Sequence, residues 1–141
     1  RLLQVPCGES SGYQLDPKQV ERFMNSNVIM IYSSAPTYPQ GVIDPIEKLS
    51  ALAIKFGVGL HVDCCLGGFV LPFARMLNYD VPKFDFECLG VTSMSADTHK
   101  YGYASKGTSV VLYRNNVSRG RQFNVPMTKI CTSSLNFECM L

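Results

Sequence analysis

The chain has 141 residues, of which 46% are hydrophobic, so it is long enough to bury the core of one domain. Its formal net charge is only +2, and the basic residues are scattered along the chain rather than clustered. This pattern argues against a nucleic-acid partner and against a basic membrane-binding surface.

The six cysteines show no regular spacing, and the adjacent pair Cys64 and Cys65 suits a mutual disulfide poorly. Free cysteines in an apolar chain of this length indicate a reducing compartment such as the cytosol. His61 and Asp63 lie close to these two cysteines, but there is no C-x-x-C pair, so we expect no metal site. The chain also has no apolar run of about 20 residues that could span a bilayer.

The first half of the chain alternates between strand-like and helix-like segments. Residues 2–5 form a short candidate strand, and Asp-Pro-Lys-Gln at residues 16–19 predicts the capped start of a helix. The continuous apolar run at residues 28–32 predicts a strand buried on both faces. Asp-Pro-Ile-Glu at residues 44–47 repeats the capping pattern, so we expect its aspartate to cap a second helix, which Gly57 ends in a left-handed conformation.

The second half continues this alternation. Residues 60–63 predict a strand that ends in a carboxylate, and residues 69–77 predict a short helix that tolerates Pro72 only near its start. Residues 91–96 and 108–113 predict two further strands. Alternating strands and helices are typical of a mostly parallel sheet with helices on both faces, so we expect an α/β fold.

Three chemically active side chains lie just beyond predicted strand ends: Asp63, Lys100 and Tyr38. Functional groups of an open parallel sheet gather at this edge, so Asp63 and Lys100 can face one crevice if their strands are near neighbours. A carboxylate and an amine at such a place suit pyridoxal phosphate, which forms a Schiff base with the amine and pairs its ring nitrogen with the acid. On the residues alone, a turn-forming aspartate and a solvated surface lysine remain open as alternatives.

Two long motifs in register resemble a known enzyme family. The first is Leu-His-Val-Asp-Cys-Cys-Leu-Gly-Gly-Phe at residues 60–69, and the second is Ser-Met-Ser-Ala-Asp-Thr-His-Lys-Tyr-Gly-Tyr-Ala at residues 93–104. With Gly-Val-Ile-Asp-Pro at residues 41–45 and the Lys-Gly pair at 106–107, they resemble the sphingosine-1-phosphate lyases of the group II decarboxylase superfamily. The similarity covers roughly residues 28–114 and implies pyridoxal-phosphate fold type I.

The resemblance implies a role for five residues. Lys100 would hold pyridoxal phosphate as a Schiff base, and Asp63 would pair with the ring nitrogen. His99 would lie near the cofactor phosphate, and Cys65 would pack on the ring, a role compatible with that of a small buried residue. Tyr38 is a candidate for a catalytic hydroxyl, with a loop anchor as the alternative.

The reaction implied by the resemblance is a carbon–carbon bond cleavage in a phosphorylated long-chain base such as sphingosine 1-phosphate, giving a fatty aldehyde and phosphoethanolamine. An amino-acid decarboxylase is the alternative within the superfamily, although the Asp-Thr-His-Lys-Tyr-Gly-Tyr-Ala stretch at residues 97–104 argues against it. A non-catalytic truncated remnant, able only to interact with a full-length partner, is the alternative from another class.

The resemblance covers only the central part of a lyase. Residues 1–114 are expected to form an incomplete large domain of fold type I, and residues 115–141 a divergent or poorly ordered tail. The lyases of this family are homodimers at the endoplasmic reticulum membrane with the site on the cytosolic face. Their membrane anchor, phosphate-binding segment and small C-terminal domain do not occur in this sequence, so we expect the chain alone to be soluble, cytosolic and weak in cofactor binding.

Overall fold

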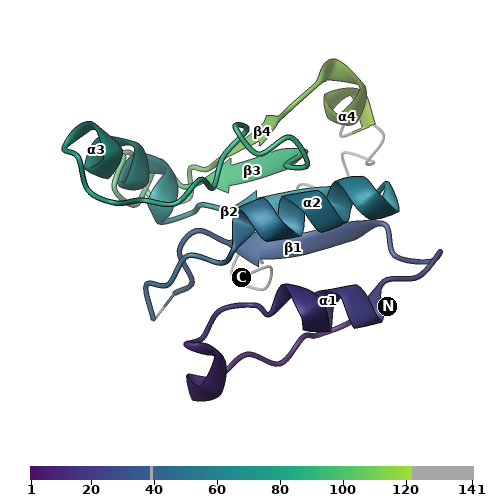
Figure 1. Ribbon diagram of the computed structural model, residues 1–141. Coiled ribbons are helices and arrows are strands. Elements are labelled where there is room, and N and C mark those ends of the chain that lie inside the picture. Colours follow the sequence, from purple (N-terminus) through teal and green to yellow (C-terminus); the bar gives the residue numbers. More distant parts are fainter. Residues whose placement is uncertain (39, 122–141) are drawn as a thin grey trace.

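An open four-stranded sheet lies at the centre of the computed structural model, which describes residues 1–38 and 40–121 (Figure 1). The strands, in the order β1-β2-β3-β4, are β1 (Met30–Ser34), β2 (Gly59–Asp63), β3 (Ser93–Ala96) and β4 (Val110–Tyr113). The first three are parallel, and β4 runs antiparallel to β3. The mostly parallel α/β sheet predicted from the sequence is therefore confirmed.

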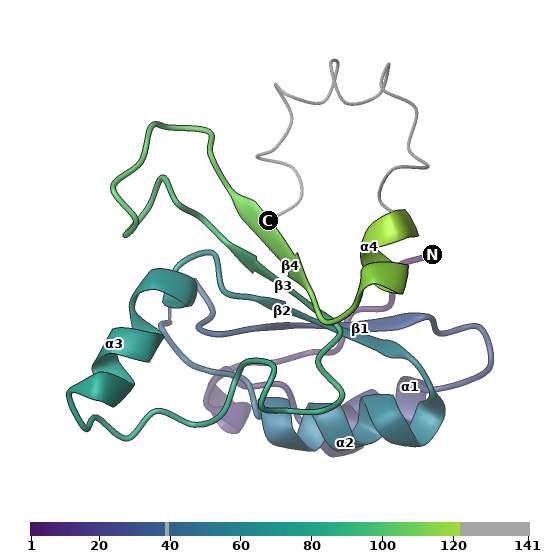
Figure 2. The same ribbon diagram turned by 90° about the horizontal axis from the view of Figure 1, so that it is seen from above.

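Helices lie on both sides of this sheet. The described residues form α1 (Pro17–Phe23), α2 (Ile46–Phe56), α3 (Leu71–Met76) and α4 (Asn116–Arg121), with 3-10 turns at Glu9–Ser11 and Gly67–Phe69. α1 and α2 lie along one face, and α4 lies on the opposite side (Figure 2). None of the helices in the described part of the chain has the length and hydropathy to cross a bilayer. α4 begins the segment expected to be a divergent tail, and residues 122–141 of that segment lie outside the described residues.

The ends of α1 and α2 are set by different groups. Asp16 caps α1 as predicted, because its side chain accepts a main-chain amide of the first turn at 2.9 Å. Gly57 ends α2 with a φ of 64°, also as predicted. The predicted cap of α2 by Asp44 is wrong, since this carboxylate instead accepts the amides of Leu15 at 2.9 Å and Ser34 at 2.8 Å. Asp44 therefore joins the N-terminal segment to the end of β1.

The strand predicted at residues 2–5 does not form. β1 is the terminal strand of the sheet, and residues of β1 and of the segment 1–5 both line a cavity of about 470 Å³. A short strand is held by main-chain hydrogen bonds to a neighbour, and in the described residues none joins this segment to β1. Within the described part of the chain, residues 2–5 therefore lack the main-chain hydrogen bonds that would make them a strand.

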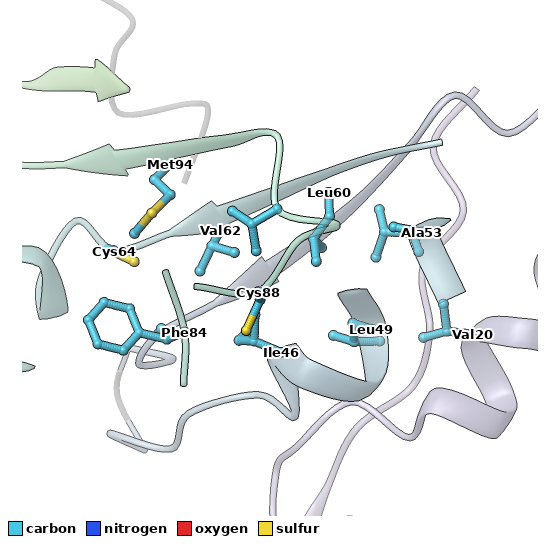
Figure 3. Close-up of a cluster of buried hydrophobic side chains, with 13 residues drawn as sticks. Val20, Ile46, Leu49, Ala53, Leu60, Val62, Cys64, Phe84, Cys88 and Met94 are labelled. Carbon is cyan, nitrogen blue, oxygen red and sulfur yellow. The ribbon is translucent and has the colours of Figure 1, made fainter. Parts of the chain in front are cut away.

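An apolar core fills the space between α2 and the sheet (Figure 3). The core-facing residues of β1 and β2 alternate with residues that point to the other face, as the period of a strand requires. Leu60 and Val62 are fully buried, whereas Met30 and Tyr32 are half exposed. The prediction that the run at residues 28–32 is buried on both faces is therefore wrong, because β1 is a terminal strand that is covered on one face only. Burial on the α2 side therefore leaves the opposite face of β2 free to carry polar side chains such as His61.

Candidate active site

The candidate site lies on the sheet face that points away from α2, at the carboxyl ends of β2 and β3. The register of these strands places His61 beside Ser93 and Asp63 beside Ser95. The loop after β3 then approaches the loop after β2, because the amide of Asp97 donates to the carbonyl of Cys65 at 3.3 Å. The predicted convergence at neighbouring strand ends is thus present in the structure.

Asp63 is 8% exposed, and three donors hold its carboxylate. Oδ2 accepts the Tyr32 hydroxyl at 2.7 Å, and Oδ1 accepts the Cys65 amide at 2.9 Å and the Ser95 hydroxyl at 3.3 Å. Burial by itself raises the pKa of Asp63, but these hydrogen bonds outweigh burial and leave the pKa below its ordinary value. Asp63 is therefore held ionised, the state that pairs with a cationic ring nitrogen.

Tyr32 and His61 support Asp63 from neighbouring positions on the same face. Their rings stack with centroids 5.2 Å apart and planes 25° from parallel. The His61 ring nitrogens lie 2.8 Å from Ser93 Oγ and 3.3 Å from Ser95 Oγ. Burial lowers the pKa of His61 and raises that of Tyr32, so both rings are neutral near pH 7. No sequence pattern singles out Tyr32, because its partner depends on the pairing of β1 with β2.

The Gly67-Gly68 pair allows the loop after β2 to fold tightly against the sheet. A β-carbon at Gly68 would lie 2.6 Å from the β-carbon of Ala96, so only glycine fits where this loop passes β3. The loop holds Cys65, which is 8% exposed and has a free thiol. Burial raises the pKa of this thiol, although the nearby amine of Lys100 acts in the opposite direction. Cys65 is therefore a small neutral side chain between the acid and the lysine.

Lys100 forms an ion pair with Asp97, three residues earlier, with 2.8 Å between Nζ and Oδ2. Burial by itself lowers the pKa of Lys100, but hydrogen bonds to Asp97 and Cys65 outweigh burial and raise the pKa. The Lys100 side chain remains 24% exposed, so the lysine is in partial contact with solvent. Lys100 is thus a protonated amine at the edge of the site.

Asp97 is the second site residue that the sequence patterns do not assign. It is 8% exposed and accepts the Ser109 hydroxyl at 2.6 Å as well as the Lys100 amine. His99 Nε2 lies 3.9 Å from the same carboxylate, and His99 Nδ1–H donates to the carbonyl of Thr108 at 2.6 Å. The available signal was the position of an acid three residues before the lysine in a turn.

Four of the five predicted site residues lie together, and one does not. Asp63 ends β2, Cys65 lies on the loop that follows it, and His99 and Lys100 lie on the loop after β3. Tyr38 lies on the loop after β1, is 77% exposed, and makes no hydrogen bond to this group among the described residues.

The donor set fits pyridoxal phosphate by its chemistry. An ionised carboxylate at the end of one strand suits the cationic ring nitrogen, and a partly exposed lysine after the next strand suits the aldehyde. A metal centre is not favoured, because no three His, Cys, Asp or Glu side chains of residues 1–38 and 40–121 converge on an ion position.

Comparison with curated proteins finds close relatives among lyases, while no protein-family model matches the chain. The sphingosine-1-phosphate lyases of Arabidopsis thaliana and Oryza sativa subsp. japonica are 55% and 58% identical over 123 residues, which is 87% of this chain and 22% of each relative. A probable L-aspartate decarboxylase of Pyrococcus abyssi is 45% identical over 102 residues, covering 72% of this chain and 27% of the relative. The chain therefore spans about a fifth of the length of the lyases it matches.

Solved structures show the same fold. The sphingosine-1-phosphate lyase of Burkholderia pseudomallei has a TM-score of 0.72 at 50% identity, covering 74% of this chain and 24% of that one. Glutamate decarboxylase of Lactobacillus brevis has a TM-score of 0.70 at 27% identity, covering 79% of this chain and 25% of that one. TDC of Oryza sativa, solved with PLP and tryptamine, has a TM-score of 0.64 at 20% identity, covering 81% of this chain and 24% of that one. The resemblance to the lyases and to fold type I is thus confirmed.

Proposed function

We propose that this chain carries the cofactor lysine and the ring-nitrogen acid of a pyridoxal-phosphate-dependent carbon–carbon lyase. The substrate class is a phosphorylated long-chain base, cleaved to a fatty aldehyde and phosphoethanolamine. The similarity to sphingosine-1-phosphate lyases at 55% and 58% identity supports this substrate class. The observation that carries the proposal is the placement of ionised Asp63 at the end of β2 and of the partly exposed Lys100 on the loop after β3, the adjacent parallel strand.

Pyridoxal phosphate, when bound, would supply an aldehyde that takes up the substrate amine and a ring that accepts electrons as the carbon–carbon bond breaks. Lys100 would hold the cofactor through its amine. Asp63 would keep the proton on the ring nitrogen, and the donors that lower its pKa keep this acid charged. Cys65 would pack against the ring as a small neutral group, and His99 would lie near the cofactor phosphate.

The resemblance to the sphingosine-1-phosphate lyases also implies a domain, a further catalytic residue, an oligomeric state and a location. Residues 1–114 would be part of a fold type I large domain, and Tyr38 would contribute a hydroxyl to catalysis. The parent enzyme implied by the resemblance would act as a homodimer at the endoplasmic reticulum membrane, with its site facing the cytosol. Crosslinking in cells, together with fractionation of membranes, tests the dimer and the location directly.

A spectroscopic experiment tests the cofactor lysine. The purified chain is mixed with pyridoxal phosphate, and we expect the visible absorbance of a Schiff base near about 410–430 nm. Lys100→Ala should abolish this absorbance, whereas Lys106→Ala, which changes an exposed lysine in the same segment, should preserve it. Equal absorbance from the two variants would mean that the cofactor reacts with surface amines, and would support the non-catalytic alternative.

Amino-acid decarboxylation is the second candidate, because the Pyrococcus abyssi relative is 45% identical over 102 residues. The two candidates differ in product. Cofactor-loaded protein is given a phosphorylated sphingoid base in one assay, and aspartate or glutamate in another. Fatty aldehyde from the first assay supports the lyase, whereas carbon dioxide from the second assay alone would replace it with a decarboxylase.

A further inference from the structure

One buried carboxylate at the site has no role in the function proposed above. Asp97 is 8% exposed, and its Oδ2 lies 2.8 Å from the amine of Lys100. The same side chain accepts the hydroxyl of Ser109 at 2.6 Å, which links it to the residue directly before β4. Its amide donates to the carbonyl of Cys65 at 3.3 Å. Asp97 is thus held from three directions, two of them outside its own loop.

The ion pair of Lys100 and Asp97 is more buried than an ordinary surface ion pair. Lys55 and Glu21 are 2.6 Å apart, but their side chains are 62% and 41% exposed, so solvent screens the attraction. The side chains of Lys100 and Asp97 are 24% and 11% exposed. A charge pair in this less hydrated place has a larger effect on the amine, and the serine hydrogen bond keeps the carboxylate in one orientation.

We propose that Asp97 is the positioning residue of the cofactor lysine, holding the Lys100 amine in place and retaining its proton whenever that amine is not bonded to the cofactor. This assignment rests on the function proposed for Lys100. The amine of a lysine has four flexible carbons between it and the backbone, so without a fixed acceptor it would sample many positions. Asp97 selects the one that faces Cys65 and the end of β2.

Other charged or titratable groups around the pair do not replace Asp97. Asp63 approaches from the end of β2 and Cys65 from the loop after it, and His99 lies 3.9 Å from the Asp97 carboxylate. The Asp63 carboxylate is already occupied by Tyr32, Cys65 and Ser95. The Cys65 thiol is neutral because burial raises its pKa. Asp97 is therefore the carboxylate whose removal should change the amine most.

The test measures the reactivity of the amine without any cofactor. Purified chain is labelled with acetic anhydride across a range of pH, and peptide mass spectrometry follows the acetylation of Lys100. Only the unprotonated amine reacts, so the pH midpoint of labelling reports the pKa of Lys100. Asp97→Asn should move this midpoint down and accelerate labelling at pH 8 by roughly tenfold. Asp97→Glu keeps the charge, so its pH midpoint of labelling should lie close to the wild-type value.

Matched variants exclude a general loss of structure. Glu21→Gln removes the acid from the exposed Lys55 pair and should leave the labelling of Lys100 unchanged. If Asp97→Asn fails to fold by circular dichroism, Ser109→Ala replaces it, and we expect a smaller shift in the same direction. An unchanged Lys100 midpoint in a folded Asp97→Asn or Ser109→Ala variant would overturn the proposal. A chain that is labelled as expected but does not take up pyridoxal phosphate would instead contradict the proposed function alone.

Discussion

At the scale of single residues, the charge of Asp63 depends on a hydroxyl that lies 31 positions away in the sequence. Tyr32 donates to Oδ2 at 2.7 Å, and this hydrogen bond lowers the pKa of Asp63 more than any other hydrogen bond that the carboxylate accepts. Because the pKa of Asp63 in the folded state is below its unfolded value, this acid contributes stability at neutral pH. The contribution is lost as the pH falls through the folded pKa.

Tyr32→Phe should therefore raise the pKa of Asp63 and move the acid loss of stability to higher pH. We expect a cost of about 1–2 kcal/mol at pH 7, since a hydrogen bond to a charged acceptor is removed. Carbon-13 NMR of the aspartate carboxyl groups gives the pKa, and urea unfolding at several pH values gives the stability. Tyr79→Phe, at a 67% exposed tyrosine, is the control and should change neither. An unchanged Asp63 titration would show that Cys65 and Ser95 alone set its charge.

At the scale of elements, the guanidinium of Arg114 joins the end of β4 to the loop before β3. It donates to the carbonyls of Val91 at 2.6 Å, Cys88 at 2.7 Å and Phe86 at 2.8 Å. The Cζ atom of Arg114 also lies 5.3 Å from the centre of the Phe86 ring. These contacts fix the approach of the chain into β3, whose far end leads to Asp97 and Lys100. The antiparallel strand therefore supports the site without contributing a reactive group.

Arg114→Lys should destabilise the chain by about 2–4 kcal/mol, because a single ammonium group cannot reproduce the planar fork of donors. The free energy of unfolding from guanidinium titrations provides the measurement. Arg119→Lys, on an exposed position of α4, is the matched control and should stay within about 0.5 kcal/mol of the wild type. If both variants unfold at the same denaturant concentration, the three carbonyl contacts contribute little.

At the scale of the whole molecule, both terminal strands of the sheet present apolar surface to solvent. Val110, Val111 and Leu112 of β4 are 40%, 46% and 48% exposed, and Ile29 next to β1 is 85% exposed. An edge strand with exposed apolar side chains is a template for association, because its main-chain groups can pair with another strand. The sheet is therefore expected to be the part of this chain that drives self-association.

Sedimentation velocity over a range of concentrations should show association of the wild-type chain. Val111→Lys should weaken this association about tenfold, since a charge on an edge strand opposes pairing. Val117→Lys changes a 75% exposed valine on α4 and should leave the association unchanged. A wild-type chain that stays monomeric throughout, or a Val117→Lys effect equal to that of Val111→Lys, would contradict the role of β4.

The amino-acid sequence by itself determined the elements whose signals are local. The apolar runs and cap residues predict β1, α1 and α2 to within a few residues, and the Asp63 and Lys100 positions follow from strand ends. Such signals extend over one helical turn or one strand, so they predict an element without information on the elements that pack against it. The family resemblance was visible for the same reason, because its motifs are contiguous.

Only the tertiary structure decided which side chains meet. Asp44 binds amides 29 and 10 residues away instead of capping its helix, and Tyr32 reaches Asp63 through the pairing of β1 with β2. Residues 2–5 have strand-like composition, but among the described residues no main-chain hydrogen bonds join them to a strand. Asp97 becomes the partner of Lys100 because a turn and Ser109 orient it. Local preference sets what a segment can be, whereas the partner of a buried polar group depends on which strands become neighbours.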